Sequence, residues 1–126
     1  MNSVAGIALS GLTAATLKLS ASASNLANIE DVAPVGGAGY QPLGVRQQSL
    51  AGGGVVATAV NLRPASYLSY DPASPLANGQ GLVSKPQIDP VAELANRMEA
   101  GQAYAFQLKA LKIADQEQKA LLDMTA

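Results

Sequence analysis

The chain has 126 residues and a formal charge of −1, so it holds at most one modest core and shows no strongly basic face. Nucleic acid is therefore not an expected partner. Cys and His are both absent, which removes disulfides, thiolate metal sites and the commonest general base. Aromatic residues make up only 4%. The many Ala, Gly and Ser residues favour close approach of backbones over bulky packing.

Residues 3 to 29 predict a helix, with Ser3 as its N-cap. Apolar and small residues repeat there in the a and d positions of a heptad. These positions are Ala5, Ala8, Leu12, Ala15, Leu19, Ser22, Leu26 and Ile29. Because Lys18 is the only charged side chain of this segment, the helix lacks the charged face of an ordinary surface helix. We therefore expect other copies of the chain, or related chains, to cover what one partner helix leaves open.

The N-terminal helix is not expected to enter a membrane. Lys18 and many hydroxyl groups interrupt its apolar residues, which argues against a transmembrane span and direct membrane insertion. Its polar positions lack the Lys and Arg residues of a helix that lies on a membrane surface. The first residues, MNSVAGIALSGL, have no basic leader and no clear cleavage site, so we also expect no cleaved secretory signal.

The end of this helix, SASASNLANIED at residues 20 to 31, is unusually polar. One interpretation is that Ser20, Ser22, Ser24, Asn25 and Asn28 are buried among neighbouring helices and fix their register, as a polar core residue does in a coiled coil. The other is that Asn28 ends the helix as a C-cap while Ser20 and Ser24 face water. The residues alone leave both interpretations open.

The middle of the chain, residues 31 to 89, has Pro, Gly and β-branched residues without a helical period. It predicts short strands near 43–50, 54–62 and 66–70, joined by Gly-rich turns. The run AGGGVV at residues 51 to 56 is not followed by Lys and Ser or Thr. It therefore predicts a flexible turn rather than a phosphate-binding loop.

Asp89 and Pro90 predict the start of a second helix, with Asp89 as N-cap, that continues to about residue 123. Two acid–base pairs at i,i+4 support it, Glu93 with Arg97 and Asp115 with Lys119. A stripe of residues with 3–4 spacing comprises Val91, Leu94, Met98, Gly101, Ala105 and Leu108.

The predicted fold is mainly α with a small β insert. Three parts follow from it: an N-terminal helix in 1–30, a β- and loop-rich segment in 31–89, and a C-terminal helix in 90–126. The two helices are expected to pack as a coiled-coil-like pair that neighbouring subunits complete. No set of residues forms a pattern for nucleophilic, metal or acid–base chemistry, so we expect no enzyme activity and no cofactor.

Two blocks of the sequence match known patterns. The run SASNLANIEDV, from Ala23 to Asn28 in particular, is similar to the N-terminal signature of the flagellar rod and hook protein family. The run from Tyr70 to Gln116 resembles the C-terminal half of the proximal rod type, FlgC. The residues that match this pattern are Tyr70, Pro72, Pro75, Gly81, Val83, Pro86, Met98, Ala103 and Tyr104.

The resemblance implies a structural subunit of the flagellar basal-body rod that transmits torque. It implies that the terminal helices line a tube around the export channel and that the middle segment lies outside. The implied partners are other copies, other rod proteins, and the export-gate and rod-junction proteins. The implied location is the periplasmic rod, reached through type III export without a cleaved signal. The residues then expected to pack between subunits are Ala5, Ala8, Leu12, Ala15, Leu19, Ser22, Asn25, Leu26, Asn28, Val91, Leu94, Met98, Gly101, Tyr104, Ala105 and Leu108.

Two alternatives remain open from the sequence. A cytoplasmic helical adaptor or export chaperone would have similar helices but would form a small defined oligomer. A neighbouring type of proximal rod subunit would share the N-terminal signature, although the run from Tyr70 to Pro86 favours the FlgC type.

Overall fold

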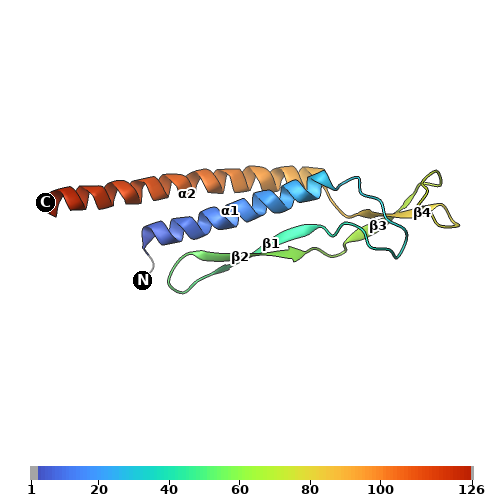
Figure 1. Cartoon of the computed structure of the whole chain (residues 1–126), viewed down its shortest axis with the longest axis horizontal. Helices are drawn as coiled ribbons and strands as arrows, with labels where there is room; N and C mark the ends of the chain where they lie inside the picture. Colours follow the sequence, from blue (N-terminus) through green and yellow to red (C-terminus); the bar gives the residue numbers. More distant parts are fainter. Residues whose placement is uncertain (1–2, 126) are drawn as a thin grey trace.

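A computed structural model gives the architecture and describes residues 3–125. The chain forms two long antiparallel helices, α1 and α2, with two β-hairpins between them in sequence. In Figure 1, α1 lies between α2 on one side and the first hairpin on the other, and the second hairpin extends past the end of the helices. The expected fold, mainly α with a small β insert, is confirmed. Residues 1, 2 and 126 of the predicted helical parts lie outside the described residues.

Helix α1 spans Val4–Ala27, close to the predicted 3–29. The Oγ of Ser3 accepts a 3.1 Å hydrogen bond from the amide of Gly6, so the predicted N-cap is confirmed. Asn28 is the C-cap, and its Nδ2 donates to the carbonyl of Ser24 at 2.8 Å. The capping interpretation is therefore correct for Asn28.

Helix α2 spans Pro90–Thr125. The predicted Asp89 cap is confirmed, because its Oδ1 accepts a 2.9 Å hydrogen bond from the amide of Val91. With 36 residues against 24, α2 continues well past the start of α1 (Figure 1). Of the two predicted acid–base pairs, Asp115 and Lys119 form an ion pair at 2.9 Å.

The four strands pair as two separate antiparallel hairpins. Strand β1, Leu43–Ser49, pairs with β2, Val55–Asn61, through a turn at residues 50–54. Gly53 and Gly54 have φ of +89° and +88° in this turn, a conformation that favours glycine. Strand β3, Ser66–Tyr70, pairs with β4, Leu82–Pro86. The sequence predicted the first three strands but not β4, whose edge also bonds to Ala33.

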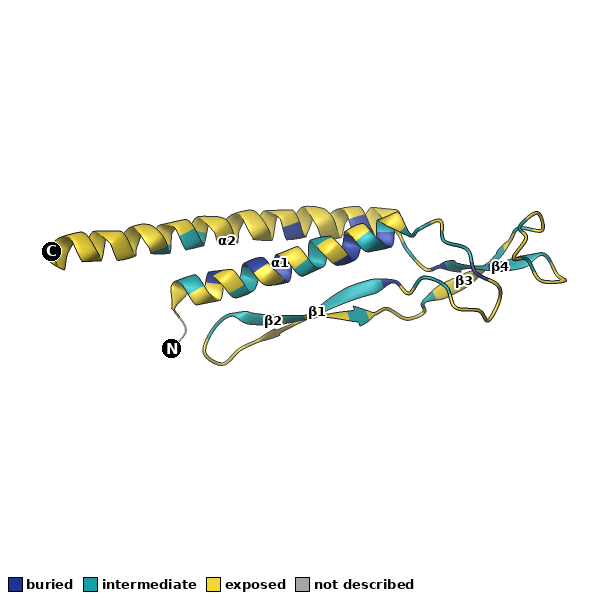
Figure 2. Cartoon of the chain, in the orientation of Figure 1, coloured by how far each residue is buried: buried dark blue, intermediate teal, exposed yellow. Residues whose placement is uncertain are grey.

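The buried residues gather on α1 and at the base of the hairpins (Figure 2). Small side chains dominate on α1, where Ala8, Ala14, Ala15 and Ala21 are buried. Helix α2 contributes only two buried residues, Glu93 and Ala100. The core is thus thin, and α2 in particular is mostly solvent-exposed in the single chain.

Helix α1 is long and apolar enough to cross a membrane, judged by length and composition alone, with a mean hydropathy of 1.4 over its best window. It is the single such helix among residues 3–125. Lys18 and the hydroxyl groups therefore do not by themselves exclude a span, and the absence of membrane insertion stays a prediction. Core helices and N-terminal signal sequences pass the same test, so the property does not identify a span.

Candidate assembly interface

Asn25, in the signature run at the end of α1, is fully buried at 0% exposure. Its Nδ2 donates to the carbonyl of Leu43 and to Oε1 of Glu93, both at 2.8 Å. Its Oδ1 accepts from the amide of Leu43 at 2.8 Å and from the Tyr40 hydroxyl at 2.9 Å. One amide therefore joins the end of α1, the start of β1 and the first turn of α2.

Two neighbouring serines extend this cluster. Ser22 is buried, and its Oγ donates to the carbonyl of Glu93 at 2.9 Å. The hydroxyls of Ser24 and Tyr40 are hydrogen-bonded to each other at 2.8 Å. We call Ser22, Ser24, Asn25, Tyr40 and Glu93 the polar hub. Its buried side-chain polar atoms all have partners, as holds throughout the described chain.

The polar hub explains why the end of α1 is polar, but in a different way from the register hypothesis. The hydrogen-bonding groups of Ser22 and Asn25 find their partners within the same chain rather than in a neighbour. Glu93 faces the hub and forms no ion pair with Arg97 among residues 3–125, so that predicted pair was wrong. The hub positions β1 and α2 against α1.

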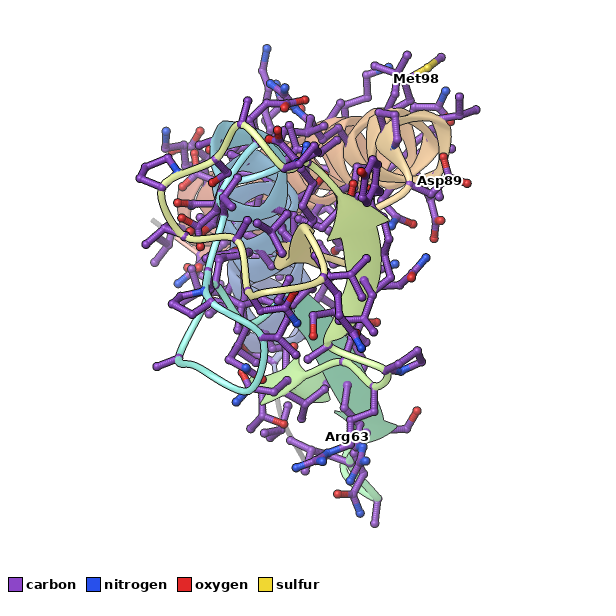
Figure 3. All side chains as sticks on the ribbon, turned by 90° about the vertical axis from the view of Figure 1, so that its right-hand side faces the viewer. Arg63, Asp89 and Met98 are labelled. Carbon is purple, nitrogen blue, oxygen red and sulfur yellow. The ribbon has the colours of Figure 1, made fainter. Side chains whose placement is uncertain are left out.

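The 3–4 stripe of α2 faces away from α1. Val91 is 74% exposed and Met98 60%, and Leu94, Gly101, Ala105 and Leu108 are exposed as well. The predicted packing residue Tyr104 shares a face with Ala100 instead and is 37% exposed. In Figure 3, Met98 points outward from the pair of helices. The face that meets α1 is instead built from small and polar residues, including Glu93, Ala100 and Gln107. A helix with its apolar stripe in water is typical of one that packs against another chain.

The predicted packing residues of α1 lie differently. Ala8, Leu12, Ala15, Ser22 and Asn25 are buried within the chain, whereas Ala5, Leu19, Leu26 and Asn28 are half-buried. The buried set has no surface left to offer a neighbour in this conformation. The half-buried set and the α2 stripe do, and their role between subunits stays a prediction.

Gly11 lies where the Gln107 side chain of α2 packs against α1. A Cβ placed on Gly11 would lie 2.5 Å from Cδ of Gln107. Nearby, Lys18 reaches across to Glu99 with an ion pair of 3.1 Å. The two helices are therefore held by small-residue contact, one exposed ion pair and the polar hub.

Two grooves follow the flank of α1 between α2 and the first hairpin, of about 440 and 300 Å³, and Lys18 lines both. A third, of about 420 Å³, lies where α1 begins and α2 continues, between Ala5 and residues near Leu111. Within residues 3–125, no three His, Cys, Asp or Glu side chains are grouped to hold a metal ion. The hydrogen bond and charge of Asp115 raise the pKa of exposed Lys119.

Comparison with known proteins bears on what these surfaces do. The family profile described as "Flagellar basal body rod FlgEFG protein C-terminal" matches residues 80–124. The flagellar basal-body rod protein FlgC of Escherichia coli O6:H1 is 35% identical over 111 residues, which is 83% of each chain. The chain belongs to the FlgC family of flagellar basal-body rod proteins. The resemblance found in the sequence is therefore confirmed.

Other FlgC relatives match with similar extent. The protein of Salmonella typhimurium is 34% identical over 111 residues, and that of Buchnera aphidicola subsp. Schizaphis graminum is 32% identical over 119 residues. The latter alignment spans 88% of each chain. Because these alignments cover most of both sequences, the FlgC likeness includes the middle segment as well as the terminal helices.

Sequence reasoning missed two residues of the polar hub. Tyr40 lies in the loop before β1, and no local pattern connected it with Asn25. Glu93 was assigned to an ion pair on the helix surface. The sequence offered one signal for the polar hub as a whole. This signal was the family resemblance, because the signature run contains two hub residues, Ser24 and Asn25.

Proposed function

We propose that this FlgC-family chain is a structural subunit of the basal-body rod whose paired helices form part of a tube wall and transmit torque. The observation that carries the proposal is the exposed apolar stripe of α2, which lacks cover in the described part of the single chain. Membership of the FlgC family supplies the context. Burying the stripe against neighbours would give the wall many van der Waals contacts and resist twisting.

The inner part of the wall is proposed to consist of 1–30 and 90–126, with 31–89 on the outside. This division is supported by the arrangement of the helices along one side of the molecule and of the hairpins along the other (Figure 1). Other copies and other rod proteins would cover the stripe. Export-gate and rod-junction proteins would contact the chain at the base of the rod.

The rod is proposed to lie in the periplasm, with the chain exported unfolded by the flagellar type III route without a cleaved signal. Edman or mass-spectrometric analysis of the chain recovered from basal bodies tests this. We expect the N-terminus to begin at Met1 or Asn2. Recovery of a shortened N-terminus would contradict it.

The deciding experiment is quantitative mass spectrometry of detergent-washed basal bodies from the source cell. A rod subunit should be present in amounts comparable to the other rod proteins. If the chain is instead found in the cytosol as a small defined oligomer, the adaptor function is correct.

A further inference from the structure

The C-terminal part of α2 carries an apolar face with one acid at its centre. We call residues 113–125 the α2 end. Ile113, Glu117, Ala120, Leu121 and Met124 fall on one helical face by their 3–4 spacing. Leu121 is 63% exposed and Met124 83%. Since Asp115 is paired with Lys119, Glu117 is an exposed carboxylate outside both ion pairs of the described residues.

The larger groove beside α1 has the opposite character. We call this groove of about 440 Å³ the receiving groove. Its apolar walls include Ala21, Leu43, Val45 and Val60, and two cations, Lys18 and Arg46, line it. Lys18 is paired with Glu99, whereas Arg46 is exposed and belongs to neither ion pair found among residues 3–125.

The one acid that lines the receiving groove is Glu93, which belongs to the polar hub. Glu93 is buried there, and its Oε1 accepts a hydrogen bond from Asn25. The groove thus presents apolar walls and the guanidinium of Arg46, and the α2 end presents an apolar face and the carboxylate of Glu117. The two surfaces are complementary in both polarity and charge.

A copy cannot fill its own receiving groove with its own α2 end. The groove involves the first turns of α2 at Glu93, and Glu117 lies 24 residues further on, about 36 Å along a straight helix. Figure 1 shows the two regions toward opposite ends of the helical pair. Contact between such unlike surfaces is heterologous, and repeated it builds a ring or an open helical array rather than a two-fold dimer.

We propose that the α2 end of one copy seats in the receiving groove of a second copy, with Glu117 opposite Arg46. This inference rests on the proposed function as a rod subunit and adds which surfaces of the chain meet. The α2 end would lie along the flank of α1 between α2 and the first hairpin. The exposed apolar side chains of Leu121 and Met124 would then be covered by the walls of the groove.

Cysteine cross-linking tests the pairing directly, because the chain has no cysteine of its own. Full-length Arg46→Cys and Glu117→Cys chains are expressed together in one cell. The basal bodies are then purified and oxidised. We expect a dimer only when both variants are present. A single chain with both substitutions should give dimers and higher multiples.

The matched control replaces Arg46→Cys by Arg63→Cys. Arg63 follows the same hairpin but lies outside the groove and points away from the helices (Figure 3). We expect no dimer between Arg63→Cys and Glu117→Cys. The proposal is overturned if Arg46→Cys and Glu117→Cys together give no dimer, if Glu117→Cys cross-links to itself, or if Arg46→Cys captures another basal-body protein instead.

Charge reversal supplies a second readout. Glu117→Arg or Arg46→Glu alone should lower recovery of the chain in basal bodies about tenfold, and the double reversal should restore it to within about twofold. Arg63→Glu, which makes the same charge change outside the groove, should leave recovery unchanged. Normal recovery of both single reversals would overturn the contact while leaving the rod function intact. Absence of the wild-type chain from basal bodies would overturn the rod function itself.

Discussion

The amide of Asn25 donates a 2.8 Å hydrogen bond to the carboxylate of Glu93, so the last turns of α1 fix the first turn of α2. The same amide holds both backbone groups of Leu43, where β1 begins. Three segments that are far apart in the sequence therefore meet at one side chain. A change at Asn25 should affect all three together.

Asn25→Ala is expected to lower the free energy of unfolding by about 3 kcal/mol, because it leaves the buried carboxylate of Glu93 and the partly buried amide of Leu43 without their partner. Urea unfolding of the purified chain, followed by circular dichroism, measures it. Asn28→Ala, in the same stretch of sequence, is the control. It removes one hydrogen bond at the helix end and should lower the free energy of unfolding by about 1 kcal/mol. Equal losses in the two variants would contradict the role of Asn25.

Glu93 offers a test of what the hub requires. Glu93→Gln keeps a carbonyl oxygen for the amide of Asn25, so the free energy of unfolding should change by less than about 1 kcal/mol. Glu93→Ala removes that acceptor and should cost about 2 kcal/mol. Thermal unfolding at one pH compares the two. A loss in the Gln variant as large as in the Ala variant would mean that the negative charge, and not the acceptor, matters.

Much of the fold was predictable because local signals set it. Ser3, Asp89 and the apolar spacing located both helices, and glycines marked the turn between β1 and β2. Strand β4 was missed because it follows a Pro- and Gly-rich stretch and is defined by pairing with β3 and Ala33. Such pairing is a property of the folded chain rather than of a short window.

The 3–4 spacing of the α2 stripe did not predict which surface the stripe faces. A 3–4 pattern says that Leu94 and Met98 share a face, but not what that face meets. In the structure, that face is open, and Ala100 and Glu93 meet α1 instead. The burial of Asn25 was likewise unreadable, since its partner Tyr40 lies 15 residues away in a loop.

Leu12 and Met98 separate folding from assembly. Leu12 is buried between the elements of one chain, so Leu12→Asp should unfold it, at a cost of more than about 3 kcal/mol. Met98 is exposed, so Met98→Asp should leave the unfolding free energy within about 0.5 kcal/mol of wild type. In basal bodies we expect both variants to be depleted. Normal assembly of Met98→Asp would show that the α2 stripe is not an interface.

Gly101 distinguishes the single chain from the assembled one. A Cβ added there meets nothing within 4 Å, and Gly in a helix interior costs about 1 kcal/mol relative to Ala. Gly101→Ala should therefore raise the unfolding free energy of the purified chain by about that amount, as measured in urea. Gly101→Leu should also fold, because its larger side chain has open space around it.

If a neighbouring helix packs closely on the stripe, the Gly101 substitutions that the single chain tolerates should weaken its assembly into basal bodies. Gly101→Leu is then expected to reduce the chain in basal bodies at least about fivefold, because the added side chain holds the neighbour away. Ala92→Leu is the matched control, since Ala92 is exposed and lies about 180° around the helix from Gly101. It should be recovered normally. Equal recovery of the two Leu variants would mean that glycine at 101 serves no close contact, and that the stripe is covered elsewhere along α2.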